Sequence, residues 1–495
     1  MWSLLQSYKG ETTAKATLEM RKCNQISLQG DTHMNYSESV KSILLQDIRD
    51  MADDPTHFVM HPERDFSRHR KIDMEQLLHF LIAMEKSSTS YELLKFFDFD
   101  HTIMPSNSAF YQQRQKLRLE AFFYLLEQFN SHFEPICYRG FQLMACDGSQ
   151  FNIARNPNDP TTFQPADGKT TRGFNSIHVV ALYDLLTKKY RDAVIQPGRQ
   201  KNEYRAICDL ADRFPVGDDK VLFIGDRGFG SYNFYAHAME KGLFFLVRVK
   251  ELNSERLLGE NIPPLKSTTT SADQLNTPAK INTQDTFNKT SHSDLMLHRI
   301  ITRSHSKKNR KYPELADQYR VIGKDGSFDF IEPGSNDEYH LDLRFLRFQI
   351  ADGVFENIVT NLPDSFNIEE IKWLYNLRWG IETSFRDLKH SIGATDFISK
   401  KVEYISQEIW SRLILYNFCS EIAAHVILTT KSRKYHYQVN FFLAIKICRH
   451  FLQLHSNKAP PDVENLIGGF TLPIRPSRNF NRIKRFRNPM SFCYR

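Results

Sequence analysis

Several features that mark large protein classes are scarce or missing in this sequence of 495 residues. The seven cysteines include no CxxC pair, which argues against a disulfide scaffold or a zinc cluster and fits a reducing cytoplasm. No apolar run reaches the about 18 residues that a membrane-spanning helix needs, since "GLFFLV" and "LILYNF" are far shorter. The beginning, "MWSLLQSYKGETTAK", has no basic region followed by an apolar stretch, so we expect no secretion signal. HExxH, P-loop and GxSxG patterns are missing as well.

The overall composition is that of a folded globular protein. Hydrophobic residues make up 41% of the chain, charged residues 25% and aromatic residues 13%, which excludes wholesale disorder. At roughly 100–200 residues per domain, the length indicates about two to four domains.

The positive charge is concentrated in one place. The net charge is +7, and the segment from Arg475 to Arg495 holds seven Arg and Lys with no Asp or Glu, so the rest of the chain is balanced. Phe480, Phe486 and Phe492 lie between these basic residues. Such a mixture suits a DNA or RNA phosphate backbone. A tail that only increases solubility is an equally good interpretation of this feature alone.

The first third of the chain divides into a polar part and a helical part. Residues 1–60 are polar and weakly patterned, and we expect a partly disordered lead-in. In 61–135, apolar residues recur at helical spacing, as in "MEQLLHFLIAM". A later segment of this region carries Arg114, Lys116 and Arg118. Short helices ending in a basic one indicate a helical N-terminal DNA-binding region, although a plain helical bundle fits equally well.

Beyond this region the pattern becomes mixed α/β. In 136–250, apolar strand-like segments such as "VLFIG" alternate with amphipathic helical ones such as "NEYRAICDLADRF", which predicts an α/β layer that is at least partly parallel. In 251–355, a Ser/Thr/Asn-rich stretch precedes alternating segments such as "LRFLRFQI", which predicts a β-rich insertion. Residues 356–428 return to the core with a long helix, and 429–495 hold C-terminal helices and the basic tail.

Two acids follow apolar strand-like segments in matching contexts. Asp147 stands in "MACDGS" and Asp226 in "FIGDRG". In α/β sheets, reacting groups gather at the carboxyl ends of strands. An Asp followed closely by Gly after a strand is also an ordinary turn signal, so each acid alone is a weak indication.

A charged stripe on a predicted helix strengthens the case. Tyr375, Arg378, Glu382 and Lys389 in "YNLRWGIETSFRDLK" are separated by 3, 4 and 7 positions. On a regular helix they fall within an arc of about 60° on one face. A solvated charged face is the simplest interpretation, because Arg378 and Glu382 can pair at i,i+4. The helix has a separate apolar side, however, which leaves the stripe facing solvent or a cleft.

Taken together, these motifs resemble a known family. The spacing Tyr-x2-Arg-x3-Glu-x6-Lys, after an Asp in "DGS" and an Asp in "GDRGF", is similar to that of bacterial insertion-sequence DDE transposases. The resemblance covers roughly Phe141 to Leu428. It implies an α/β fold with a ribonuclease-H-like catalytic core and a β-rich insertion, flanked by helical N- and C-terminal regions.

The same resemblance implies an activity and a set of site residues. Such enzymes bind the terminal inverted repeats of a transposon, cleave DNA at its ends and join the 3′-hydroxyls to target DNA. Asp147, Asp226 and Glu382 would be the catalytic and metal-binding residues, and the DNA-binding residues would be Tyr375, Arg378 and Lys389. Some family members stack a Trp of the insertion on a flipped base. The four tryptophans here all lie outside the insertion, so no base-stacking residue is assigned.

Three converging carboxylates also predict a metal requirement. Without a cation they would repel one another, and carboxylate oxygens are the ligands that Mg²⁺ prefers. We expect two Mg²⁺ ions per active site, replaceable by Mn²⁺, that assist an in-line displacement at phosphorus. Arg378 and Lys389 would hold the flanking phosphates without reading the DNA sequence.

Partners and location follow from the resemblance, and two alternatives remain. We expect double-stranded DNA as the partner, both as transposon ends and as target, a homodimer or higher synaptic complex, no membrane, and a bacterial cytoplasm with association to the nucleoid. The alternatives are a metal-dependent DNA nuclease on the same core that does not transpose, and a DNA-binding protein that has lost catalysis.

A first prediction concerns Lys389. Replacing it in Lys389→Ala should weaken DNA binding and lower the slope of log affinity against log salt by about 1, because one phosphate contact is lost. Titrations of a DNA duplex at several salt concentrations measure this slope. An unchanged slope would contradict a phosphate contact at Lys389.

Overall fold

The structure is a computed structural model that describes residues 35–166, 172–215, 217–250, 293–304, 318–323, 326–351, 354–394, 397–428, 435–454 and 461–475. The chain forms two compact units. The first combines Met1–Asn202 with Trp379–Arg495, and the second is Glu203–Arg378.

The described elements of the first unit are mostly helices around a small antiparallel sheet. They are α3 (Tyr36–Asp53), a 3₁₀ turn (Pro55–His57), α4 (Met74–Ala83), α5 (Thr89–Phe96), α6 (Asn107–Arg114), α7 (Glu120–Ser131), β1 (Phe141–Ile153), β2 (Phe163–Gln164), β3 (Phe174–Asp184), β4 (Lys189–Pro197), α13 (Trp379–Asp387), a π-helical turn (Leu388–Ile392), α14 (Val402–His425), β11 (Tyr437–Val439), α15 (Phe441–Gln453), α16 (Val463–Gly468) and β12 (Thr471–Pro473).

Strand β3 organises the sheet of the first unit. It pairs antiparallel with β1, with β4 and with the short β2. Almost every residue of β3 is buried, and its run Val179–Leu182 is continuously apolar. A strand covered on both faces has this pattern, because neither side of the pleat faces water. The small β11–β12 pair lies among the C-terminal helices.

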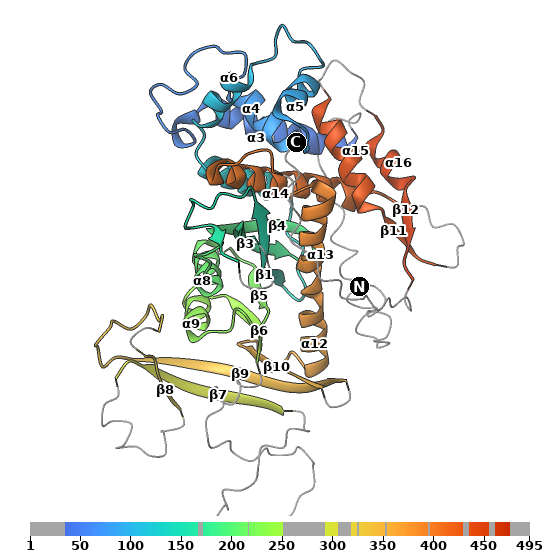
Figure 1. Cartoon of the computed structure of the whole chain (residues 1–495). Coiled ribbons are helices and arrows are strands. Elements are labelled where there is room, and N and C mark those ends of the chain that lie inside the picture. Colours follow the sequence, from blue (N-terminus) through green and yellow to red (C-terminus); the bar gives the residue numbers. More distant parts are fainter. Residues whose placement is uncertain are drawn as a thin grey trace, which may run out of the picture. The chain divides into compact units, whose positions relative to one another are not determined.

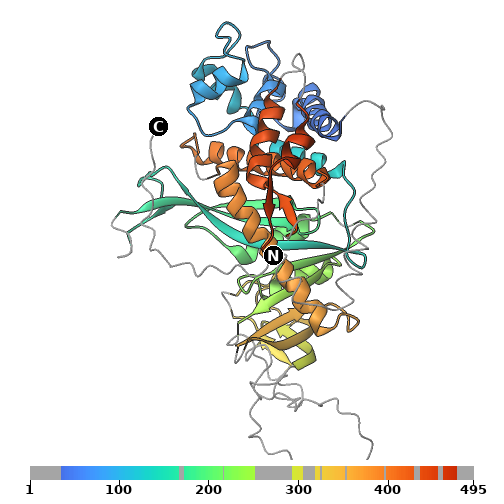
Figure 2. The same cartoon turned by 90° about the vertical axis from the view of Figure 1, so that its right-hand side faces the viewer.

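Helix α14 is the central helix of this unit. It is buried around its circumference from Tyr404 to Ile422, and it contacts β4, α7, α3 and α4. Figure 1 shows it between the N-terminal helices and the strands β3 and β4. Figure 2 shows the N-terminal helices beside the C-terminal ones, in agreement with the contact between α4 and α15. One apolar core therefore joins segments from both ends of the chain.

The N-terminal segments differ from the sequence-based expectation in two ways. Part of the polar lead-in predicted for 1–60 is the helix α3, which buries Val40, Leu44 and Ile48, while residues 1–34 lie outside the described residues. The spacing of these apolar residues is helical, but polar neighbours obscure it. Arg114, one of the basic residues of the predicted helical DNA-binding region 61–135, is also only 1% exposed, and the assignment of this region to DNA binding stays a prediction.

The second unit is a mixed α/β layer. Its described elements are α8 (Glu203–Arg213), β5 (Lys220–Gly225), α9 (Tyr232–Glu240), β6 (Phe244–Val249), β7 (Ser293–Thr302), β8 (Tyr319–Val321), β9 (Glu338–Ala351), β10 (Val354–Thr360) and α12 (Ile368–Leu377). Strands β5 and β6 are parallel and are connected through α9. The long strands β7 and β9 continue the sheet antiparallel through β10, and β8 pairs parallel with β7. The mixed α/β class predicted from the sequence is confirmed.

The sheet order places the strands of the region 251–355 beside those of the predicted core. Within this unit the order is β5-β6-β10-β9-β7-β8. Because β10 pairs with both β6 and β9, the strands of this region extend the same sheet. The Ser/Thr/Asn-rich stretch from 251 to 292 lies outside the described residues. Among the described helices, none is both long and apolar enough to cross a membrane.

A buried ion pair ties α6 to α14 in the first unit. Arg114 donates from Nε to Gln407 Oε1 at 2.8 Å and from an NH2 group to the Tyr404 carbonyl at 2.6 Å. Its guanidinium also lies 3.4 Å from Glu408 Oε1, and neither side chain is more than 1% exposed. The charge is buried at a cost, which its hydrogen bonds and the facing carboxylate offset.

Removing this cation should destabilise the first unit. Arg114→Ala leaves the Glu408 carboxylate short of a partner, and we expect the free energy of unfolding to fall by about 3–5 kcal/mol. Chemical denaturation followed by tryptophan fluorescence measures the change. Arg49→Ala is the control, because Arg49 pairs with Glu75 at 3.9 Å where both are about 40% exposed. A loss for Arg114→Ala no larger than that of the control would refute the role of the buried pair.

Candidate active site

Asp147 lies in the middle of β1. The prediction that it ends a strand is wrong, because β1 continues to Ile153 and Asp147 faces Ala181 in register. The following Gly148 pairs with Val180 and forms no turn. The carboxylate of Asp147 accepts a hydrogen bond of 2.8 Å from the backbone N–H of Gly148. The side chain is half-buried.

Glu382 lies in the first turn of α13, which packs against β1. Ile381 and Phe385 on this helix are buried in the core, and Ser384 Oγ lies 2.8 Å from the Tyr190 hydroxyl of β4. Gly380 permits the close approach, since a Cβ there would stand 3.0 Å from Leu185 Cδ2. The apolar core and a buried hydrogen bond to β4 therefore fix α13, the helix of Glu382, which packs against the strand of Asp147.

Lys389 follows in the π-helical turn and reaches the same strand. Its ammonium group donates to Ser149 Oγ at 2.7 Å and to the Gln150 carbonyl at 2.8 Å. Burial lowers the pKa of Lys389, and the negative charge of Asp147 opposes this shift. A cation is thus fixed on β1 within two to three positions of Asp147.

Asp226 belongs to the second unit and directly follows β5, as predicted. Its carboxylate accepts a hydrogen bond of 2.7 Å from the backbone N–H of Arg227, and its carbonyl accepts one of 2.9 Å from Phe229. A Cβ at Gly225 would stand 3.3 Å from Phe229 Cβ, so the small residue before Asp226 permits this tight turn. The chain then enters α9, whose first turn is capped by Ser231.

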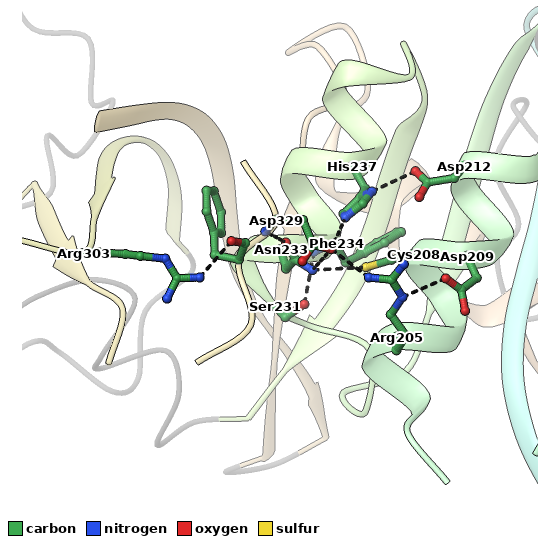
Figure 3. Close-up of polar contacts among 11 residues, drawn as sticks. Arg205, Cys208, Asp209, Asp212, Ser231, Asn233, Phe234, His237, Arg303 and Asp329 are labelled. Atoms are coloured by element: carbon green, nitrogen blue, oxygen red, sulfur yellow. Dashed lines mark hydrogen bonds and ion pairs between the residues drawn. The ribbon is translucent and has the colours of Figure 1, made fainter. Parts of the chain in front are cut away.

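Helix α9 is anchored by a polar network within the second unit (Figure 3). Asp329, in the segment between β8 and β9, accepts hydrogen bonds from Asn233 at 3.1 Å and Arg205 at 3.0 Å. His237 lies between two carboxylates, 2.9 Å from Asp329 and 2.8 Å from Asp212. The network joins α8 and α9 to the strand-rich region, and it therefore supports the turn that carries Asp226.

Tyr375, near the end of α12, lies beside Asp226, and Arg378 follows directly after this helix. The Tyr375 hydroxyl donates to Asp226 Oδ1 at 3.3 Å, and the Arg378 guanidinium lies 5.5 Å from the centre of the Tyr375 ring. Burial raises the pKa of Tyr375 to about 12, with the Asp226 charge acting in the same direction and Arg378 against it. Both residues are only 3% exposed. This burial favours a role inside the protein, and their assignment to DNA binding stays a prediction.

The long regular helix expected for the charged stripe is interrupted twice. Helix α12 ends at Leu377 and α13 begins at Trp379, and between them the Arg378 N–H bonds to the Tyr375 carbonyl in a tighter, three-residue turn. The chain then widens into the π-helical turn at Leu388–Ile392. The arc of about 60° predicted for the four charged-stripe residues assumed one regular helix, so it does not describe their positions. Tyr375 and Arg378 belong to the second unit, and Glu382 and Lys389 belong to the first.

A charged pair next to Asp226 was not identified from the sequence. Arg248 on β6 lies 3.4 Å from Glu356 on β10, and the Glu356 side chain is 12% exposed. Nothing in the segments "FFLVRVK" and "VFENIVT" marks these two residues, since they are brought together only by strand pairing. Among the described residues, no group of three or more His, Cys, Asp or Glu is arranged to hold a metal ion.

Comparisons with known proteins were made on sequence and on fold. The sequence model of the family described as "Transposase DDE domain" matches residues 139–418, which is more than half of the chain. Among curated proteins, none matches the chain. Among solved structures, the chain is similar to one described as a cryo-EM structure of the piggyBac transposase synaptic complex with hairpin DNA. The sequence identity is 10%, the TM-score is 0.42, and the match covers 85% of this chain and 80% of that one.

The network around Asp329 predicts a pH-dependent contribution to stability. Burial alone would raise the pKa of Asp329, but hydrogen bonds from Asn233 and His237 and the charge of Arg205 outweigh it and hold the pKa below its usual value. A carboxylate with a depressed pKa stabilises the fold above its unfolded pKa of about 3.9, and this contribution disappears as the pH falls through the folded pKa.

Asp329→Asn should therefore lower the thermal unfolding midpoint clearly at neutral pH and much less at an acidic pH below the folded pKa of Asp329, where the wild-type carboxylate is protonated as well. Differential scanning calorimetry at both pH values checks this. Asp209→Asn removes the other carboxylate that binds Arg205, at 2.8 Å in an exposed i,i+4 pair, and should change little at either pH. An equal effect of Asp329→Asn at both pH values would contradict the assignment.

Proposed function

Because the chain belongs to the family of transposases with a DDE domain, we propose that it is a DNA transposase that binds transposon terminal inverted repeats, cleaves DNA at the ends and joins the 3′-hydroxyls to target DNA. The observation that carries this proposal is the packing of α13 on β1 inside the matched region. This contact brings the helix of Glu382 to the strand of Asp147, with Lys389 beside them.

A ribonuclease-H-like core is proposed for the matched region. The order of elements supports it, because the antiparallel strands β1, β3 and β4 are followed along the chain by the parallel pair β5 and β6 with helices α8 and α9. In sheets of this kind, reacting groups stand where strands end or bend, as Asp226 does after β5.

Asp147, Asp226 and Glu382 are the proposed catalytic residues and metal ligands. The donor set fits a hard divalent cation, since all three groups are carboxylates and Asp147 and Asp226 are already oriented by backbone N–H groups. Two Mg²⁺ ions, replaceable by Mn²⁺, would supply Lewis-acid stabilisation and a lowered water or hydroxyl pKa when bound. The three carboxylates would place the cations at the scissile phosphate. Glu382 lies on a helix whose buried contacts fix its position.

Lys389 is the proposed contact to the DNA backbone nearest Asp147. Its ammonium group lies on Ser149 and Gln150 of the same strand, so it favours a phosphate next to the reacting one without reading bases. Tyr375 and Arg378 complete the proposed DNA-binding set, although both are buried beside Asp226.

The remaining proposals concern assembly and location. A homodimer or higher synaptic complex is proposed, because two transposon ends must be joined in one reaction, and a bacterial cytoplasm with nucleoid association is the proposed location. The basic segment 475–495 is a further candidate for DNA binding, and all of it except Arg475 lies outside the described residues.

A metal-dependent nuclease on the same core is the second candidate, and a DNA-binding protein without catalysis is the third. A strand-transfer assay separates them. Duplexes that end in the flanking repeats of the gene, with a free 3′-hydroxyl, are incubated with a supercoiled plasmid and Mg²⁺. A transposase joins the duplex to the plasmid, a nuclease cuts without joining, and a protein without catalysis binds and does neither.

Glu382→Gln tests the site itself. The neutral amide keeps the shape of the side chain but loses the charge, so we expect cleavage to fall by more than about a hundredfold, the upper range for loss of even an outer partner of a metal ligand. End binding in a gel-shift assay should be largely unchanged. Glu403→Gln, an exposed carboxylate at the start of α14, is the control and should cleave normally. A fully active Glu382→Gln protein would remove Glu382 from the active site.

A further inference from the structure

We propose that Glu356 is a positioning residue for Asp226, acting through Arg248 and Tyr375. This inference rests on the proposed function, because it gives Glu356 and Arg248 a role only if Asp226 binds the metal. All four residues belong to the second unit and come from β10, β6, α12 and the turn after β5.

Three interactions connect Glu356 to Asp226 in sequence. Glu356 Oε1 lies 3.4 Å from a guanidinium nitrogen of Arg248. Arg248 hydrogen-bonds in turn to the Tyr375 side chain. The Tyr375 hydroxyl lies 3.3 Å from Asp226 Oδ1. Together these contacts form an unbroken series from Glu356 to Asp226.

The chemistry of the middle link determines the direction of the last one. A guanidinium has donors only, so in its bond with Arg248 the Tyr375 oxygen must be the acceptor. The single hydroxyl proton of Tyr375 is then directed to Asp226. That bond engages Oδ1 and holds the carboxylate in one orientation, which is the role that outer partners of metal-binding carboxylates have.

Glu356 also lies among positive charges. Burial raises the pKa of the Glu356 carboxyl, Arg248 and Arg378 lower it, and the charge of Asp226 raises it, so that the raising effects prevail. Without this carboxylate, Arg248 would lose its ion pair, and Asp226 is another carboxylate whose charge acts on it. A guanidinium binds a carboxylate in preference to a phenol oxygen, because the bond is charge-assisted. Arg248 would then leave the Tyr375 oxygen, and the Tyr375 hydroxyl proton would no longer be directed to Asp226.

Strand register fixes the pair, and the same sheet offers a matched control. Arg248 faces Ile358 across β6 and β10, so Glu356, two residues earlier on β10, lies diagonally on the same face. Arg344 likewise faces Met296 across β9 and β7, and Asp294 lies two residues before it. Asp294 binds Arg344 at 2.7 Å and 2.9 Å. Asp294→Asn thus removes an equivalent diagonal ion pair that does not reach Asp226.

The test measures Mn²⁺ binding to the full chain without DNA, using the electron paramagnetic resonance signal of free Mn²⁺. Glu356→Gln and Tyr375→Phe should each weaken Mn²⁺ binding by about tenfold, the lower range for outer partners of metal ligands. The double variant should bind no more weakly than the weaker single variant, because the two residues act in series. Asp294→Asn should bind as the wild type does. Cleavage of the repeat-ended duplex should fall in parallel, and Glu356→Gln, which is not one of the proposed DNA-binding residues, should keep its DNA affinity.

Each possible outcome of the Mn²⁺-binding test refutes a different part of the proposal. If Asp226→Asn weakens Mn²⁺ binding but Glu356→Gln does not, the positioning role is refuted and the proposed function stands. If the losses of the single variants multiply in the double variant, the two residues act independently and the relay is refuted. An equal loss in Asp294→Asn would assign the effect to the stability of the sheet and refute positioning. If Asp226→Asn leaves Mn²⁺ binding unchanged, the proposed site and this inference both fail.

Discussion

The packing of α13 against β1 is the contact on which the candidate site depends. Both elements belong to the first unit but lie far apart in the sequence, and Ile381 and Phe385 of α13 are buried in the core of this unit. The hydrogen bond between Ser384 and Tyr190 also ties α13 to β4 of the same sheet. Because removing buried apolar groups from a well-packed core is costly, the helix has little freedom to move away from the strand. The positions of Glu382 and Lys389 are therefore set by the packing of α13 and of the π-helical turn that follows it.

Buried or half-buried arginines paired with carboxylates occur in both units. Arg114 joins α6 to α14 in the first unit, and Arg248 and Arg378 surround Glu356 beside Asp226 in the second. The charges of Arg114 and Arg248 are each faced by a carboxylate, and each pair would be costly to break by removing one partner. The arginines near Asp226 therefore constrain the site electrostatically as well as sterically. Their burial also explains why a sequence pattern that suggests a phosphate-binding stripe is only partly exposed.

Local sequence patterns predicted the elements better than the contacts between them. The strands and helices between 136 and 250 follow from apolar periodicity, and the family resemblance followed from acids and spacing that need no three-dimensional information. The position of Asp147 inside β1 was missed, because a following Gly resembles a turn although Gly148 continues the strand pairing. The breaks at Arg378 and after Asp387 carry no proline signal. Glu356 was missed because its partner Arg248 is adjacent only through strand register.

The central claim is that Asp147, Asp226 and Glu382 bind the same metal centre. Anomalous diffraction from crystals of the full chain grown with Mn²⁺ and a repeat-ended DNA duplex tests it most directly. The account predicts Mn²⁺ peaks with an oxygen of each of the three carboxylates within about 2.0–2.6 Å of a bound ion. Ions bound elsewhere, or a centre that one of the three carboxylates does not reach when DNA is bound, would contradict it.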